Sequence, residues 1–288
     1  MGFDPFLYVA FAGGFVAGRF VRTHGRWVER ATIATMLVLL LLLGGTLGEL
    51  PATQVLDAIP VAVLFTVLLL GLTLGFVWLL PRPARPPETI APPITGRFPI
   101  EFVFAAALVI GYGTLGRLSV PWNSALEWAL YVLLALVAFD LRISRRGLRS
   151  LWVPLTAAAA AAPIAAYAMV LAAGLSLPVS LAIATGFGWY TLAGPLVAAK
   201  VGPVLGLVAF LTNFFRENLT MLSAPRVGAR LGGEGIVALG GATSMDTTLY
   251  FATRFGSRDS ANIALASGLI LTIAAGLLLP ALLSLPGA

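Results

Sequence analysis

The stretch Val55–Leu80, VLDAIPVAVLFTVLLLGLTLGFVWLL, decides the fold class of this chain. It carries a single charge, Asp57, and is longer than the roughly 20 apolar residues that cross about 30 Å of hydrocarbon as a helix. Its apolar residues are continuous rather than spaced along one face, which is typical of a helix surrounded by lipid. The stretch therefore predicts a transmembrane helix.

The composition extends this prediction to the whole chain. Of 288 residues, 59% are hydrophobic and 10% are charged, which lies far outside the range of soluble domains. Continuous apolar runs also exclude a disordered, collagen-like or coiled-coil chain. We therefore expect an all-α polytopic membrane protein with eight to ten transmembrane helices.

The individual spans follow from apolar runs that are bounded by charge, proline or polar clusters. They are predicted at 5–21, 31–48, 55–80, 100–116, 124–141, 151–173, 180–199, 203–222, 236–253 and 260–283. The pair 180–199 and 203–222 has an alternative interpretation as a re-entrant hairpin. Eight full crossings therefore stand as an alternative to ten.

The orientation follows from the positions of arginine and lysine in short loops. Three clusters follow the first, third and fifth spans: Arg19, Arg22, Arg26 and Arg30; Arg82, Arg85 and Arg97; Arg142, Arg145, Arg146 and Arg149. We expect these clusters in the cytoplasm, both termini outside, and no cleaved signal peptide. Further basic residues agree with this topology, namely Lys200, Arg254 and Arg258. Others fall on the wrong side, namely Arg117, Arg226 and Arg230.

The chain is predicted to have two transmembrane halves, 1–150 and 151–288, with a proline-rich linker at 81–99 in the first. The first span resembles the fourth, since Phe15–Arg19 matches Tyr112–Arg117. The second resembles the fifth, with Gly44 matched to Ala138. Repeats offset by an odd number of spans are inverted in the membrane, as in many secondary transporters.

Four acidic residues fall within or at the ends of predicted spans, where an ionised side chain costs about 2.5–3.5 kcal/mol even on a lenient scale. They are Glu49, Asp140, Glu217 and Asp246. Glu49 also fits an exposed loop beside Pro51. Asp140 also fits an interfacial pair with Arg142 or Arg145.

Asp246 lies in the polar string Gly240-Gly241-Ala242-Thr243-Ser244-Met245-Asp246-Thr247-Thr248, between two apolar segments. Glycines let the backbone leave the helix, and hydroxyl groups such as those of Thr243 and Ser244 satisfy the freed backbone groups. The string predicts a broken membrane helix that aims a helix end into a cavity. An ordinary extramembrane loop is the alternative.

Glu217 belongs to a second polar block, Thr212–Thr220. Asn213, Glu217 and Thr220 share one helix face, whereas Arg216 points about 100° away. The block predicts a polar stripe that contributes to a site. The alternative is an ion pair of Arg216 with Glu217 or Asp246 that serves structure only.

Motifs of soluble chemistry are missing from the sequence. Without cysteine there is no disulfide, thiolate metal site or cysteine nucleophile. There is also no phosphate-binding lysine loop, His-x-x-x-His pair or Gly-x-Ser-x-Gly elbow. We expect no enzyme, cofactor, metal or nucleic-acid partner. The oligomeric state is left open, a homodimer included.

The C-terminal half resembles the LysO family of bacterial lysine exporters. The matching blocks are Ala184–Gly194 (ATGFGWYTLAG), Gly202–Gly206, Asn213 with Arg216-Glu217, and Gly240–Leu249. Tyr250 departs from the family pattern, which has proline there. The resemblance implies export of L-lysine and its toxic analogues across the inner membrane. It also implies that Glu217 and Asp246 are required, with Glu49 similar to a third family acid.

A lysine site needs carboxylates for the ammonium groups and a cation or helix N-terminus for the α-carboxylate. Glu217 and Asp246 supply the first, and the glycine-rich break, Asn213 or Arg216 the second. We expect proton/lysine antiport. The alternatives are a small-cation/proton antiporter that uses the same carboxylates, an intramembrane enzyme and a structural membrane subunit.

Overall fold

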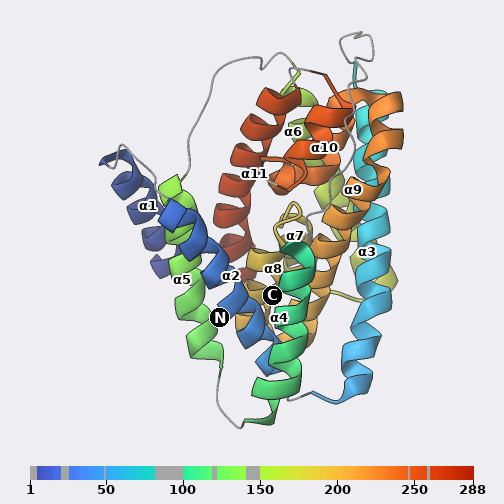
Figure 1. Cartoon of the computed structure of the whole chain (residues 1–288). Helices are drawn as coiled ribbons and strands as arrows, with labels where there is room; N and C mark the ends of the chain where they lie inside the picture. Colours follow the sequence, from blue (N-terminus) through green and yellow to red (C-terminus); the bar gives the residue numbers. More distant parts are fainter. Residues whose placement is uncertain are drawn as a thin grey trace.

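The computed structural model of the chain describes residues 5–20, 26–48, 50–81, 100–118, 122–140, 150–245, 247–257 and 260–288. Within these ranges it contains helices and no strand (Figure 1). The helices are α1 (Pro5–Phe20), α2 (Arg26–Leu47), α3 (Ala52–Leu79), α4 (Ile100–Thr114), η1 (Leu115–Arg117), α5 (Asn123–Asp140), α6 (Trp152–Ala173), α7 (Leu177–Ala184), α8 (Tyr190–Lys200), α9 (Pro203–Gly240), η2 (Gly241–Met245), α10 (Leu249–Phe255) and α11 (Ser260–Leu283).

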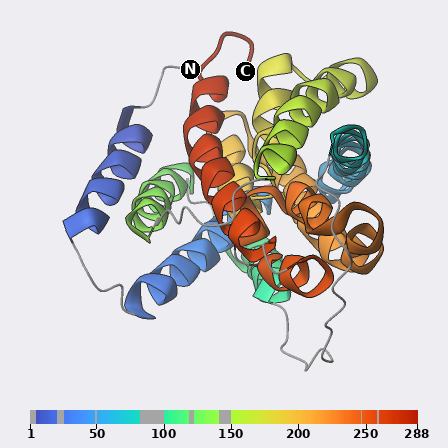
Figure 2. The same ribbon diagram turned by 90° about the horizontal axis from the view of Figure 1, so that it is seen from above.

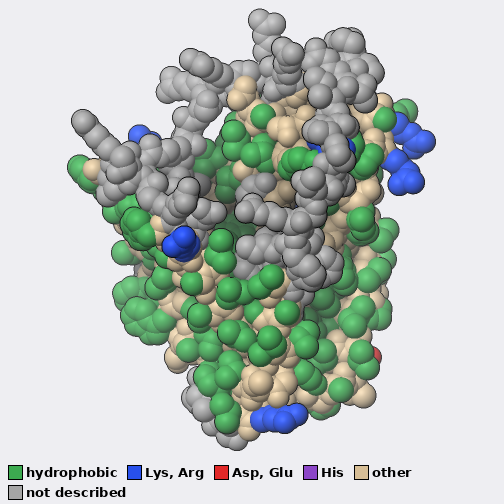
Figure 3. All heavy atoms as spheres, in the orientation of Figure 1, with side chains coloured by type: hydrophobic (Ala, Val, Ile, Leu, Met, Phe, Trp, Pro, Cys, Tyr) green, Lys and Arg blue, Asp and Glu red, His purple; other side chains and the backbone are tan. Residues whose placement is uncertain are grey.

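Four of these helices are long and apolar enough to cross a membrane by length and composition: Arg30–Leu47, Ala52–Leu79, Trp152–Ala173 and Ser260–Leu283. Large hydrophobic side chains such as Val67, Leu171 and Leu222 are exposed on the outside of the bundle. Figure 3 shows hydrophobic side chains spread over most of one face, with a few basic side chains near its upper and lower ends and on its left side. The prediction of an all-α polytopic membrane protein is confirmed.

The N-terminal helices pack in two corresponding pairs, α1 with α5 and α2 with α4. A Cβ at Gly14 would lie 2.2 Å from the carbonyl oxygen of Ala135, and one at Gly111 would lie 2.1 Å from that of Leu41. The predicted repeat matches Gly14 to Gly111 and Leu41 to Ala135. In both helix pairs, therefore, the matched glycine contacts the matched carbonyl oxygen of the partner helix. Small residues permit this close approach in membranes. The two contacts have the pairing that an inverted repeat requires, and the repeat itself stays a prediction.

The C-terminal half contains a helical hairpin that enters the bundle and returns, here called hairpin 1 (residues 177–200). The end of the bundle at which α1 ends, with Arg19 in its last turn, and α2 begins, before Arg30, is here called the arginine end. α6 runs away from this end, and residues 174–176 lead from α6 into α7. α8 ends at Lys200, whose Nζ lies 3.2 Å from Oε1 of Glu127. Glu127 is in the first turns of α5, at the opposite end of the bundle. Both arms of hairpin 1 therefore start from that opposite end.

A second hairpin enters from the arginine end, here called hairpin 2 (residues 233–255). Gly232 has φ 71° and ψ −173° and breaks α9 into a long and a short helix. A Cβ at Gly233 would lie 3.2 Å from Cα of Gly256, so the two arms of the hairpin meet at its base. Ser150, which directly precedes α6, donates a hydrogen bond of 2.6 Å to Oε1 of Glu234 at this base.

These hairpins correct the ten-span prediction. Among the described residues, the helices outside the two hairpins are α1 to α6, the long part of α9 and α11. The predicted span 180–199 is hairpin 1 by itself, and 236–253 is hairpin 2 rather than a crossing. The predicted hairpin of 180–199 with 203–222 is also wrong, because α9 continues past residue 222 to Leu231 as one full helix.

The corrected path changes the positions of basic residues. Arg226 and Arg230 lie in the part of α9 that reaches the arginine end, so they no longer fall on the wrong side. Lys200 moves to the opposite end, where Glu127 balances its charge. The ten-span count had inverted both, because hairpin 1 had been counted as a crossing.

The hairpins lie in the interior of the bundle. Seen from above, α1 and α2 lie at one side, α3, α6 and α9 at the other, and α11 runs between them (Figure 2). α11 packs against α7 and against the 3-10 turn η2, while α8 packs against α5, α2 and α9. Both hairpin tips are therefore enclosed by full-length helices.

Candidate functional site

The tips of the two hairpins touch. The backbone N–H of Ala242, in the tip of hairpin 2, donates a hydrogen bond of 2.8 Å to the carbonyl oxygen of Phe187, in the tip of hairpin 1. Phe187 has φ 48°, a left-handed conformation that is costly for a side chain with a Cβ. Gly241 has φ 64°, and a Cβ there would lie 2.2 Å from the Phe187 oxygen. The predicted helix break at 240–248 is confirmed, and it meets a second break.

The contact between the two hairpin tips is here called the crossing. Four polar side chains of α9 are buried beside it. They are Asn213, Arg216, Glu217 and Thr220, each at most 1% exposed. The stripe of Asn213, Glu217 and Thr220 was expected on one face, with Arg216 pointing elsewhere. Arg216 is buried as well, because the short helix 233–240 covers the neighbouring face of α9.

Asn213 contacts hairpin 1. Its Oδ1 accepts a hydrogen bond of 2.8 Å from the backbone N–H of Gly188. Its Nδ2 donates to the carbonyl oxygen of Ile183 at 3.1 Å and to that of Ala209, one turn earlier in α9, at 3.0 Å. The amide therefore joins the broken end of α7 to α9.

Arg216 contacts hairpin 2. Its Nε donates to the carbonyl oxygen of Leu239 at 2.9 Å, and its Nη2 donates to that of Ala238 at 3.2 Å. These carbonyls belong to the last turn of a helix, where carbonyl groups lack intrahelical partners and the helix dipole is negative. The guanidinium group satisfies both the hydrogen bonds and the charge of this helix end.

Glu217 contacts the tip of hairpin 2 from the side. The hydroxyl group of Thr247 donates a short hydrogen bond to its Oε1. Asp246 directly precedes Thr247 and lies outside the described residues. The structure therefore brings Glu217 next to the chain position that flanks Asp246. Thr247 was part of the polar string, yet its type alone did not single it out.

Thr243 and Ser244 satisfy backbone groups within the break. Thr243 donates to the Gly240 carbonyl oxygen at 3.0 Å, and Ser244 donates to those of Gly241 and Ala264 at 2.7 and 2.9 Å. Hydroxyl groups serve this purpose wherever a membrane helix is interrupted. Both residues lie at the crossing.

The remaining predicted acids are not brought to the crossing by any described contact. Glu49 lies outside the described residues, and Asp140 is described only as the last residue of α5. In the described part of the chain, no group of three or more His, Cys, Asp or Glu residues could hold a metal ion.

A buried carboxylate that sequence analysis did not select lies at the base of hairpin 2. Glu234 is 5% exposed and accepts the hydrogen bond of Ser150, which is fully buried. It lies between the predicted spans 203–222 and 236–253. Glu234 lies just before the apolar run 236–239, and an acidic residue in the first turn is typical of a helix. This position could have indicated that Glu234 belongs to a helix.

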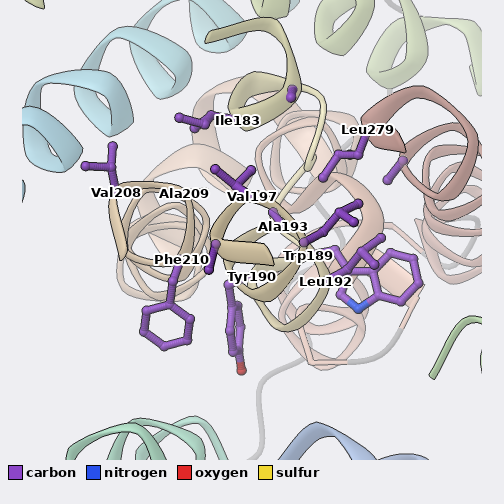
Figure 4. Close-up of a cluster of buried hydrophobic side chains, with 14 of the residues drawn as sticks. Ile183, Trp189, Tyr190, Leu192, Ala193, Val197, Val208, Ala209, Phe210 and Leu279 are labelled. Carbon is purple, nitrogen blue, oxygen red and sulfur yellow. The ribbon is translucent and has the colours of Figure 1, made fainter. Parts of the chain in front are cut away.

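Apolar side chains of hairpin 1 and α9 pack beside the crossing. Ile183, Val197, Val208, Tyr190 and Phe210 belong to one buried hydrophobic cluster (Figure 4). The rings of Tyr190 and Phe210 lie edge to face with centroids 5.4 Å apart. The polar groups of the crossing therefore adjoin a buried hydrophobic core.

Comparison with known proteins points to one family. A family model described as "Lysine exporter LysO" matches residues 102–283. The lysine exporter LysO of Escherichia coli (strain K12) is 33% identical over 161 residues, 52% of this chain and 52% of that protein. A putative lysine exporter of Haemophilus influenzae is 32% identical over 114 residues, 39% of this chain and 58% of that protein.

The match thus spans little more than half the length of these curated relatives. No solved structure matches the chain. The matched residues include both hairpins and the polar face of α9.

Proposed function

The chain belongs to the lysine exporter LysO family, and we propose on this premise that it is a secondary transporter that exports L-lysine from the cytoplasm. One structural observation carries the proposal beyond the family. A buried carboxylate, Glu217, lies at the crossing of two re-entrant hairpins that enter from opposite ends of the bundle. Substrate sites of many secondary transporters lie at such broken helices near the middle of the membrane.

Glu217 and Asp246 are proposed to bind the ammonium groups of lysine. Glu217 is buried and accepts a hydrogen bond from the hydroxyl group of Thr247, which follows Asp246 in the chain. An ammonium group carries three donors and needs acceptors of opposite charge in a water-poor site. Two carboxylates would meet this need, and Thr243 and Ser244 add hydroxyl groups nearby.

The α-carboxylate of lysine is proposed to face the start of α8. This helix begins at Tyr190, directly after the tip of hairpin 1, so its positive dipole end points to the crossing. We do not assign this role to Asn213 or Arg216, whose donors are directed at backbone carbonyl oxygens.

Proton antiport is proposed as the energy source. Lysine leaves as a cation, and moving one positive charge out against an inside-negative potential costs about 2.3 kcal/mol per 100 mV. Uniport would therefore retain lysine in an energised cell. If a carboxylate that releases lysine takes up a proton from outside, the inward proton gradient drives export, and the same cycle would carry toxic lysine analogues.

The membrane is proposed to be the bacterial plasma membrane, with the arginine end in the cytoplasm. Arg226 and Arg230 strengthen this orientation because they also lie at the arginine end. α1 begins and α11 ends at the other end, so both termini are proposed to lie outside. Protons and membrane lipid are the further partners of this proposal, and no catalytic role is assigned.

The test uses purified protein in liposomes that contain labelled lysine. We expect an outside-acid pH gradient to drive lysine efflux, and we expect Glu217→Gln and Asp246→Asn to abolish it while the protein stays folded. Glu127→Gln is the matched control, since Glu127 pairs with Lys200 far from the crossing. Wild-type efflux by both amide variants would overturn the site. Proton flux driven by sodium ions without lysine flux would identify the alternative small-cation antiporter.

A further inference from the structure

A single turn of α9 is bonded to both hairpins. Asn213 accepts a hydrogen bond from Gly188 N–H and donates one to the Ile183 carbonyl oxygen, so it is attached to hairpin 1. Arg216, three residues later on the same helix, donates to the Leu239 and Ala238 carbonyl oxygens of hairpin 2. One rigid helical turn therefore sets the position of one hairpin relative to the other.

The two tips close this arrangement into a ring of contacts. Ala242 N–H donates directly to the Phe187 carbonyl oxygen at 2.8 Å. A Cβ at Gly188 would lie 2.9 Å from the Gly240 carbonyl oxygen, so the backbones themselves are in contact. Hairpin 1, hairpin 2 and the long part of α9 (residues 203–231) thus each form hydrogen bonds with the other two.

The side chains of this ring have little capacity left for a ligand. An asparagine amide has two donors, and both donors of Asn213 point to carbonyl oxygens, at Ile183 and Ala209. Arg216 is 1% exposed, and two of its three nitrogens donate to a helix C-terminus. A buried cation in that place satisfies the negative helix end that would otherwise attract an ion.

We propose that Asn213 and Arg216 are positioning residues that brace the two hairpins into one unit, and that neither binds lysine. This inference rests on the proposed transport function. The site formed by Glu217 and the hairpin 2 tip then changes its access when the whole braced unit shifts against α1, α2, α4 and α5. Without the brace, both tips could open at the same time, which would connect the two sides and dissipate the gradient.

Amide hydrogen exchange tests the brace without any transport measurement. The informative variants are Asn213→Ala and Arg216→Lys, the second of which keeps the charge but loses the planar fork. Each variant should speed exchange in the hairpin that its side chain does not touch. We expect about tenfold faster exchange of Ala242 N–H in Asn213→Ala and of Gly188 N–H in Arg216→Lys, as for loss of one strong hydrogen bond.

Asn218→Ala is the matched control. Asn218 is on the same helix, and its Nδ2 donates only to the Phe214 carbonyl oxygen of α9 itself, so its loss should leave both tips unchanged. If Arg216→Lys does not accumulate, exchange of Ala242 N–H in Asn213→Ala decides the test by itself. Faster exchange confined to the directly bonded hairpin overturns the brace.

Transport separates positioning from binding. Asn213→Ala liposomes should leak lysine without a pH gradient, and the lysine KM should stay within about twofold of wild type while the gradient-driven rate falls. A KM raised tenfold or more with coupling intact would make Asn213 a lysine ligand and overturn the inference. If wild-type protein moves no lysine, the proposed function fails, and the exchange experiment alone decides whether the brace exists.

Discussion

The two hairpins meet at one crossing but are held in different ways. In hairpin 1 the returning arm α8 is buried along its whole apolar length, from Tyr190 to Ala198. In hairpin 2 the entering arm 233–240 is buried, whereas only Ala252 of the returning arm α10 is. Hairpin 1 is therefore held by packing. Hairpin 2 is held by the packing of its entering arm and by the hydrogen bonds of its tip.

The bases of the two hairpins also differ in the polar contact that joins each of them to a neighbouring helix. Hairpin 1 is joined to α5 by the Lys200–Glu127 ion pair, whose side chains are 19% and 36% exposed. Hairpin 2 is joined to α6 by the buried Ser150–Glu234 hydrogen bond. A well-packed hairpin has little need of a strong polar anchor, and a weakly packed one depends on it. Four substitutions rank these contributions.

The largest effect is expected at the contact that both hairpins share. Gly241→Ala places a Cβ 2.2 Å from the Phe187 carbonyl oxygen and should prevent the tips from meeting, with loss of folded protein and of transport. Gly174→Ala is the control, because Gly174 has the same φ of 64° but open space around it. It should cost only the left-handed backbone, about 1–2 kcal/mol. Yield of monodisperse protein measures both, and equal yields would show that the crossing tolerates displacement.

A buried side chain of hairpin 1 should come next. Leu192→Ala leaves a cavity in α8 and should destabilise the protein by about 2–5 kcal/mol, since membrane helices are held by packing. Tyr250→Ala in α10 is the counterpart, because Tyr250 is 45% exposed. It should cost under about 1 kcal/mol. Thermal unfolding in one detergent compares them, and similar shifts would contradict the packing difference.

The anchor of hairpin 2 should have an intermediate effect. Ser150→Ala leaves the buried Glu234 Oε1 without its hydroxyl donor, which should cost about 1–3 kcal/mol. The loss should concentrate at the hairpin base, so proteolysis or hydrogen exchange at residues 232–236 is the local measurement. Unchanged exchange there would mean that Glu234 does not hold the base.

The smallest effect is expected at the anchor of hairpin 1. Lys200→Met removes a partly exposed ion pair with Glu127, and such pairs contribute about 0–1 kcal/mol. Raising the salt concentration should weaken the wild-type protein by no more than this amount. A shift in the unfolding midpoint larger than that of Ser150→Ala would reverse the proposed order of the two anchors.

Local composition was sufficient to predict the helices and the break. The interruption at 240–248 was predictable because two glycines and four hydroxyl residues cannot continue an apolar helix. The hairpins were not predictable in the same way. An apolar run of about 20 residues is compatible with one crossing or with two short arms, and only neighbouring helices distinguish these outcomes.

The site shows the same division. Glu217 stood out because a carboxylate is costly inside a membrane span, wherever the span lies. The hydrogen-bond partners of Arg216 and Asn213 could not be predicted, because both side chains donate to backbone carbonyl oxygens, which every residue has. Glu234 was passed over because its burial depends on α6, which is distant in sequence.

By itself, the sequence determined that this chain is an all-α membrane protein of the lysine exporter LysO family, with a broken helix and acidic residues in its apolar segments. Hydropathy and residue type are local properties, so they can be read along the chain. Only the tertiary structure decided that two helices turn back and that Asn213 and Arg216 hold their tips together. Those outcomes depend on contacts between distant segments, since each freed backbone group in a membrane must find a partner wherever the fold supplies one.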